Sequence, residues 1–148
     1  MIQAPPHKST IADLDGNILA MLVYITAYVM MWIPGVSYFA WAAPLAVFLL
    51  EKRSPFIRFH ALQALILTVT QIILTFVVSL ILGAIVVAII AASANPFGLT
   101  GFVFLPIISL LISLTFSVFA GIACYQAYRY FEYEIPVIGK LARKFGKF

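Results

Sequence analysis

The chain has 148 residues, of which 64% are hydrophobic and only 9% are charged, and its formal net charge is +4. A soluble domain carries roughly 25% charged residues, so this composition excludes a protein whose whole surface faces water. The single cysteine excludes an internal disulfide and a cysteine-rich metal site.

Charged residues are missing from two long stretches of the sequence. No Asp, Glu, Lys or Arg occurs from Gly16 to Leu50 or from Phe59 to Tyr128. Lipid selects such stretches because an ionised side chain in hydrocarbon is strongly unfavourable. The sequence therefore predicts an all-α fold, a polytopic bundle of membrane helices that forms a single membrane domain over residues 1–148.

The first third of the chain predicts a polar arm followed by two short apolar segments. Residues 1–13 form the arm, which we expect to be flexible because it is polar and contains a proline pair. A Pro-Gly turn separates the segments 17–33 and 36–50. The second segment reaches about 22 Å as a helix, short of the roughly 30 Å hydrocarbon core, and Pro44 is expected to kink it. The segments form either two thin spans or a hairpin that stops part-way, and two spans are favoured because a turn in lipid leaves backbone groups unpaired.

Two longer apolar segments follow, at 56–92 and 101–128. As a single helix the first reaches roughly 55 Å, nearly twice the hydrocarbon core. It must therefore tilt, protrude, lie partly in the interface or break, and Gly83 is the expected break. A loop with turn chemistry separates the two segments, and residues 136–148 predict a short amphipathic tail helix.

The positions of the charges predict the topology. All charged residues lie at or before Asp15, between Glu51 and Arg58, or from Arg129 onward. Four spans put these three regions on one side of the membrane, and the excess of Lys and Arg makes that side cytoplasmic. We therefore expect four transmembrane helices with both termini cytoplasmic. The partner of the basic residues is then anionic lipid of the bilayer and not nucleic acid.

Polar side chains recur along one face of segment 56–92. At about 100° per residue they fall within an arc of about 140°. Polar groups in a membrane helix face other helices or a water-filled cavity, so this polar stripe predicts interhelical hydrogen bonds, with a path for a polar solute as the alternative. Its members are His60, Gln63, Thr70, Gln71 and Thr75.

Small residues recur at a spacing of four in both long segments. This spacing lets helix backbones approach closely, so we expect a packing seam between the two segments, with a contact to another chain as the alternative. The seam residues are Ser79, Gly83, Ser109, Ser113, Ser117 and Gly121.

Two groups of charged residues flank the apolar segments. The tail cations share one helical face and predict contact with anionic lipid; they are Lys140, Arg143, Lys144 and Lys147. The second group is expected to form salt bridges at the membrane boundary; its members are Glu51, Lys52, Arg53, Arg58, Arg129, Glu132 and Glu134.

The sequence offers no catalytic motif. It lacks a nucleophile elbow, a zinc-protease helix, a phosphate-binding loop and a dinucleotide-binding glycine pattern. His60 has no second placed ligand, so a metal or haem site is not expected. We therefore expect no enzyme activity, no catalytic residues, no metal and no cofactor.

Two stretches resemble a known family. One is Glu-Lys-Arg-Ser-Pro-Phe-Ile-Arg-Phe-His-Ala-Leu-Gln-Ala-Leu at 51–65; the other is Tyr-Gln-Ala-Tyr from Tyr125 with Tyr-Glu-Ile-Pro-Val-Ile-Gly-Lys-Leu-Ala at 133–142. Together they resemble a family of small prokaryotic membrane proteins of unknown function, which is similar to the twenty-kilodalton Tic component of chloroplast protein import. The resemblance covers about residues 14–144. It implies a multi-span bundle with both termini on one side and no catalytic residues.

These observations lead to two functional hypotheses. The first is a non-enzymatic accessory or scaffold subunit, or a component related to protein translocation, in a prokaryotic plasma membrane. It is expected to bind other membrane protein chains, as a homo-oligomer or within a larger complex. The alternative is an oligomeric conduit for a small solute or ion that uses the polar stripe.

Overall fold

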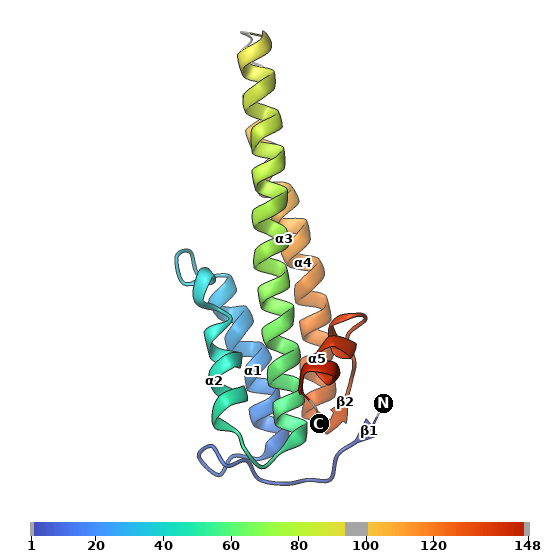
Figure 1. The fold of residues 1–148 in the computed structure, drawn as a ribbon. Helices are drawn as coiled ribbons and strands as arrows, with labels where there is room; N and C mark the ends of the chain where they lie inside the picture. Colours follow the sequence, from blue (N-terminus) through green and yellow to red (C-terminus); the bar gives the residue numbers. More distant parts are fainter. Residues whose placement is uncertain (1, 94–100, 147–148) are drawn as a thin grey trace. The chain divides into compact units, whose positions relative to one another are not determined.

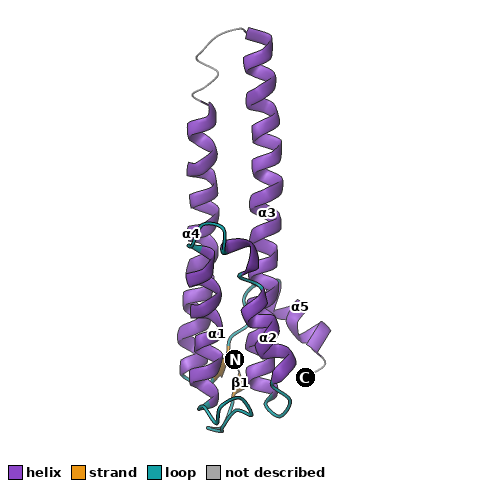
Figure 2. Cartoon of the chain, turned by 90° about the vertical axis from the view of Figure 1, so that its left-hand side faces the viewer, coloured by secondary structure: helices purple, strands orange, loops and turns teal. Residues whose placement is uncertain are grey.

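The structure is a computed structural model that describes residues 2–93 and 101–146, and the described chain is mostly helical (Figure 2). The expected turn at 94–100 and the tail residue Lys147 lie outside the described residues. In chain order the elements (Figure 1) are β1 (Ile2–Gln3), α1 (Gly16–Met31), the 3-10 helix η1 (Ser37–Phe39), α2 (Ala42–Leu50), α3 (Pro55–Ser93), α4 (Gly101–Tyr128), β2 (Phe131–Glu132) and α5 (Ile138–Gly146).

The chain divides into two compact units. Unit 1 consists of Met1–Val69 together with Ser117–Phe148, and unit 2 consists of Thr70–Phe116. Unit 1 therefore contains α1, η1, α2, both short strands and α5 with the adjoining parts of α3 and α4, whereas unit 2 contains the remainder of α3 and α4.

Two of the described helices are long and apolar enough to cross a membrane. They are Pro55–Ala92 in α3 and Val103–Tyr128 in α4. Helices α1 and α2 are apolar but shorter. The prediction of a mostly helical chain with long apolar helices is confirmed, while the structure does not confirm the expected four spans.

The segment expected at 36–50 is not one helix. It divides into η1 and α2, and α2 has 9 residues, which reach only about 14 Å. Pro44 does not kink a longer helix as expected. It lies in the first turn of α2, where the missing N–H needs no intrahelical partner.

Helix α3 shows no break at Gly83, contrary to the sequence-based expectation. The helix has 39 residues and continues through this glycine to Ser93. Glycine lowers the stability of a helix interior by only about 1 kcal/mol relative to alanine, so a single glycine does not end a helix of this length.

The N-terminal arm is folded and not the flexible segment that its composition suggested. Strand β1 pairs antiparallel with β2, so that Ile2 lies opposite Glu132 and Gln3 opposite Phe131. The backbone N–H of Ala4 continues this pairing to the carbonyl of Tyr130 at 2.9 Å. The arm is therefore held by the chain segment that follows α4.

The core of unit 1 lies where α1, α3 and α5 meet. Phe59, Leu62 and Ala142 form a buried cluster. Tyr24 and Ala27 of α1 are also almost completely buried. This core fixes the beginning of α3, and the polar groups described below are built around it.

Candidate functional site: a charged cap above a buried polar core

The beginning of α3 is fixed by Ser54 of the preceding loop and by Pro55. The Ser54 hydroxyl accepts a hydrogen bond from the N–H of Ile57 at 3.1 Å, and Pro55 is the first helical residue. This is a favourable helix start, because serine caps the free N–H groups and proline has no N–H to satisfy.

Glu51 organises the same loop through hydrogen bonds, and it forms no ion pair with another residue that the structure describes. Its Oε1 accepts the N–H groups of Arg53 at 3.0 Å and Ser54 at 3.1 Å, and its Oε2 accepts the N–H of Thr10 at 2.9 Å. Burial of Glu51 favours the neutral carboxyl, but these backbone donors outweigh burial and hold the pKa of Glu51 below its ordinary value. The expected salt bridge of Glu51 is thus replaced by backbone hydrogen bonds.

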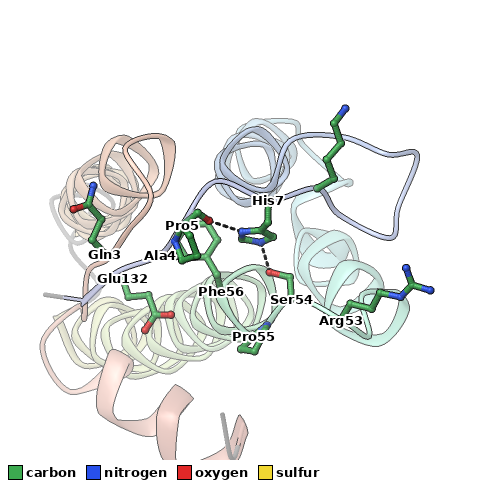
Figure 3. A pocket seen from close by; sticks show the side chains of 10 residues that line it. Gln3, Ala4, Pro5, His7, Arg53, Ser54, Pro55, Phe56 and Glu132 are labelled. Carbon is green, nitrogen blue, oxygen red and sulfur yellow. Dashed lines mark hydrogen bonds between the residues drawn. The ribbon is translucent and has the colours of Figure 1, made fainter.

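His7 connects the arm to the same serine (Figure 3). Its Nδ1 lies 2.8 Å from the carbonyl oxygen of Pro5, and its Nε2 lies 2.6 Å from Ser54 Oγ. A carbonyl only accepts, so this geometry assigns the proton to Nδ1 and lets the Ser54 hydroxyl donate to Nε2. Gly16 is required nearby, because a Cβ there would lie 2.7 Å from His7 Nε2.

A cavity of about 490 Å³ lies beside this pair, lined by Gln3, Ala4, Pro5, His7, Lys8, Arg53, Ser54, Pro55, Phe56 and Glu132. The Ser54 hydroxyl donates to His7 and accepts from Ile57, and the residue is only 4% exposed. Both hydrogen-bonding capacities therefore serve the helix start and the arm, which favours a structural role over nucleophilic chemistry.

We call the arm (residues 2–15), the loop 51–54 and the segment 129–134 the charged cap. Its parts meet through the contacts of Thr10 and His7 with the loop and through the pairing of β1 with β2. Lys8 also lies 3.5 Å from Asp13 and 3.9 Å from Asp15, in exposed ion pairs that contribute little to stability.

A buried polar core lies beneath the charged cap, and Gln63 is its centre. Gln63 Nε2 donates to the Tyr24 hydroxyl at 2.9 Å and to the Tyr133 carbonyl at 3.0 Å, while its Oε1 accepts the N–H of Ile135 at 3.2 Å. His60 Nδ1 lies 3.2 Å from the same tyrosine hydroxyl. One amide thus joins α1, α3 and the segment that leads into α5.

Helix α5 is held by a second set of polar contacts. Arg143 donates from Nη2 to Glu132 at 2.9 Å and from Nε to Glu134, and its guanidinium lies over the ring of Phe59 at 4.7 Å. The expected boundary salt bridges of Glu132 and Glu134 are therefore formed with a tail cation. Gly139 lets this packing occur, because a Cβ there would lie 2.6 Å from Glu134 Cα.

The remaining boundary cations contact aromatic rings or solvent. Arg58 lies over Phe48 at 5.0 Å, and Arg129 lies over Tyr125 and Phe131 at 5.8 and 5.4 Å. Lys52 and Arg53 are exposed.

The predicted polar stripe is divided between the two units. His60 and Gln63 belong to the polar core of unit 1, whereas Gln71 belongs to unit 2 and donates to Ser113 Oγ at 3.2 Å. Thr75 is half-buried, and Thr70 is exposed, so Thr70 does not belong to a buried stripe. A threonine side chain on the lipid side is tolerated because its hydroxyl can bond to the backbone of its own helix.

The predicted seam is formed by its serines and not by its glycines. In unit 2, Ser79 and Ser109 face each other at 3.5 Å between their hydroxyl oxygens. A Cβ built on Gly83 or Gly121 would meet nothing within 4 Å, so neither glycine is a point of close helix approach. Ser117 is half-buried in unit 1.

The tail differs from its predicted basic face. Lys140 and Lys144 are exposed, but Arg143 turns inward to the carboxylates and does not belong to a lipid-facing row. Its inward position follows from two acidic residues that precede α5 and lie within its reach.

Sequence reasoning missed His7, Ser54 and Tyr24. The sequence features that could have indicated them are a histidine beside a proline pair, a Ser-Pro helix start and a tyrosine inside a charge-free segment. It also missed Thr68, a buried residue whose hydroxyl donates to the carbonyls of Ala64 at 2.9 Å and Leu65 at 3.0 Å.

Within the described residues, no group of three or more His, Cys, Asp or Glu side chains is arranged to hold a metal ion. Comparison with protein families gives a match over residues 15–142 to the MamF/MmsF family, described as the magnetosome magnetite crystal formation protein family. The chain belongs to the MamF/MmsF family. Neither a curated protein nor a solved structure matches it.

Membership of the MamF/MmsF family overturns the resemblance to the Tic-related family. The expectation of a small membrane protein family was right, but the link to protein import is wrong. The quoted stretch at 51–65 contains Ser54, Phe59 and Gln63, which start α3 and dock α5 on it. Such packing requirements carry no information about import. MamF/MmsF membership and the two long apolar helices together identify an integral membrane protein.

Proposed function

We propose that this chain is a non-enzymatic scaffold of the magnetosome membrane that takes part in magnetite crystal formation. The observation that carries the proposal is the family match, which spans residues 15–142 and thus both structural units. The scaffold role is supported by the division of the molecule into a charge-free membrane part and a charged cap with exposed side chains for partner proteins.

The contacts within unit 1 also support a common side for the charged cap and the C-terminal region. If α3 and α4 both cross the membrane, the loop 51–54 and the segment 129–134 lie on the same side. The arm contacts both of them, so it lies there too, whether α1 and α2 cross fully or return part-way. The cationic excess makes this side the cytoplasmic one.

The conduit alternative has weaker support. His60 and Gln63, which were to begin a polar path, hydrogen-bond to Tyr24 and to the backbone of 133–135. These contacts use polar groups that would otherwise be available to a solute. The structure therefore favours interhelical hydrogen bonding for this part of the stripe.

Deletion of the gene in a magnetosome-forming bacterium tests the function. We expect altered size or shape of the magnetite crystals in electron micrographs and restoration by the wild-type chain. The variant Lys52→Gln/Arg53→Gln changes two exposed cap cations and should restore the protein level but not the crystals, if the cap binds partners. The proposal would be refuted if the deletion strain formed unchanged crystals and the chain were absent from magnetosome membranes purified from the wild-type strain.

Cysteine labelling tests the topology separately. In a Cys124→Ala background, Lys8→Cys and Lys140→Cys should react from the cytoplasmic side and Asn95→Cys from the opposite side. Labelling of Lys8→Cys and Lys140→Cys from different sides would contradict the proposed arrangement.

A further inference from the structure

Helix α5 has two chemically different faces. Its buried residues are Ile138, Gly139 and Ala142. At about 100° per residue, Lys140 and Lys144 lie opposite this buried face, and both are exposed. The helix therefore turns a pair of cations directly away from the protein.

The depth of α5 is fixed by its packing on α3. Ala142 contacts the cluster that contains Phe59 and Leu62. These residues lie about 6–10 Å along α3 from its start at Pro55, at a rise of about 1.5 Å per residue. Arg58 is the last charged residue before the charge-free stretch begins at Phe59, so in a bilayer crossed by α3 this level lies close to the boundary between headgroups and hydrocarbon.

Two exposed apolar side chains lie near the outward cations. Phe145 is 68% exposed and Val137, just before α5, is 70% exposed.

We infer that the exposed part of α5, with Lys140 and Lys144 on its outward face and the exposed Phe145 and Val137 beside them, binds an anionic lipid surface. Cations bind anionic headgroups, and neighbouring apolar side chains contact the adjoining acyl chains. Lys140 and Lys144 carry the charge complementarity, since the nearby carboxylates of Glu132 and Glu134 are held by Arg143.

This surface is a rigid part of the protein and not a loose tail. Gln63 bonds to the backbone of Ile135, and Arg143 fixes α5 against Phe59. Lipid bound at α5 is thereby connected directly to the polar core of unit 1.

Tryptophan fluorescence in vesicles tests the inference. In the full chain with Trp32→Phe and Trp41→Phe, the substitution Phe145→Trp places a single reporter on α5. We expect its emission to shift to the blue and to be quenched by brominated lipid, more strongly in phosphatidylglycerol than in phosphatidylcholine vesicles. Addition of Lys140→Gln/Lys144→Gln should abolish the difference between the two lipids. The control Lys8→Gln removes an exposed cation outside α5 and should retain the difference.

Two outcomes would overturn the inference. Quenching by aqueous acrylamide with no response to brominated lipid would place the face in water. Protection from both quenchers that disappears at one chain per vesicle would identify a second copy as the occupant. Hydrogen exchange of the unsubstituted chain gives an independent measurement, in which the α5 amides should exchange more slowly in anionic than in zwitterionic vesicles; equal rates would contradict lipid binding.

Discussion

Units 1 and 2 accommodate polar groups in opposite ways. Every charged residue of the sequence lies in unit 1, whereas Thr70–Phe116 contains none. In unit 1, buried side chains such as Glu51 and Gln63 bond to backbone groups far away in the sequence. Unit 2 instead exposes large apolar side chains, including Phe76 and Leu80, as expected of helices solvated by lipid.

The comparison shows where tertiary contacts determine the structure of a membrane protein. Helix backbones satisfy their own hydrogen bonds, so unit 2 needs few specific contacts. The loops, strands and helix ends of unit 1 leave backbone groups that only other side chains can satisfy. Unit 1 should therefore be the more sensitive to the loss of a single polar side chain.

The largest expected effect comes from replacing the same residue type in both units. Gln63→Leu removes three hydrogen bonds and leaves the N–H of Ile135 and the carbonyl of Tyr133 unpaired, so we expect a loss of about 3 kcal/mol of stability. Gln71→Leu removes one hydrogen bond to Ser113 and should change stability by about 1 kcal/mol or less. Unfolding in detergent by titration with dodecyl sulfate measures both. Equal losses of stability in the two variants would contradict the difference between units 1 and 2.

Paired glycine substitutions come next. Gly139→Ala forces a methyl group to within 2.6 Å of Glu134 Cα and 2.8 Å of Gln63 Oε1, so we expect destabilisation by about 2 kcal/mol. Gly83→Ala meets nothing within 4 Å and should stabilise the helix by about 0.5 kcal/mol. Thermal unfolding in detergent distinguishes them, and a stabilised Gly139→Ala variant would contradict the packing of α5.

A pH titration sharpens the comparison through Glu51. The folded-state pKa of Glu51 lies below its ordinary value of 4.5. The stability that the ionised carboxylate contributes is therefore fully present above pH 4.5 and is lost as the pH falls through the folded-state pKa. Glu51→Gln should lower stability by about 1 kcal/mol at neutral pH and reduce the loss on acidification. The melting temperature of both chains between pH 7 and pH 3 measures this. Parallel curves would show that Glu51 is not held ionised by the loop.

The smallest expected effect lies in unit 2. Ser79→Ala removes the contact with Ser109 at 3.5 Å, and hydrogen bonds between membrane helices average about 0.6 kcal/mol. We expect a loss of about 0.5 kcal/mol in the dodecyl sulfate titration. A loss as large as that of Gln63→Leu would mean that unit 2 also depends on a specific polar contact.

Much of the fold was predictable where one property dominates. The limits of α3 and α4 follow the ends of the charge-free stretch closely, since 56–92 and 101–128 were expected and Pro55–Ser93 and Gly101–Tyr128 are observed. The prediction of one helix over 36–50 was wrong because apolar composition does not distinguish one helix from a 3-10 turn followed by a short helix. That difference depends on how α2 packs on α1.

The candidate site was less predictable than the helices. Gln63 stood out as a polar residue in an apolar helix, but its partners Tyr133 and Ile135 offer backbone groups, which leave no trace in side-chain chemistry. The His7–Ser54 contact joins residues 47 positions apart. Arg143 looked like its neighbours Lys140 and Lys144 because sequence gives a helical face but not its surroundings.

The sequence by itself determined that this protein is a membrane protein and that its charged residues are confined to a few segments. Burying a charge in hydrocarbon is so unfavourable that its effect is visible in the composition. Only the tertiary structure decided which polar groups are used internally and which remain for lipid or partners. Hydrogen bonds between distant segments are short-ranged and directional, so their pairing exists only once the backbone has brought α1, α3 and α5 together.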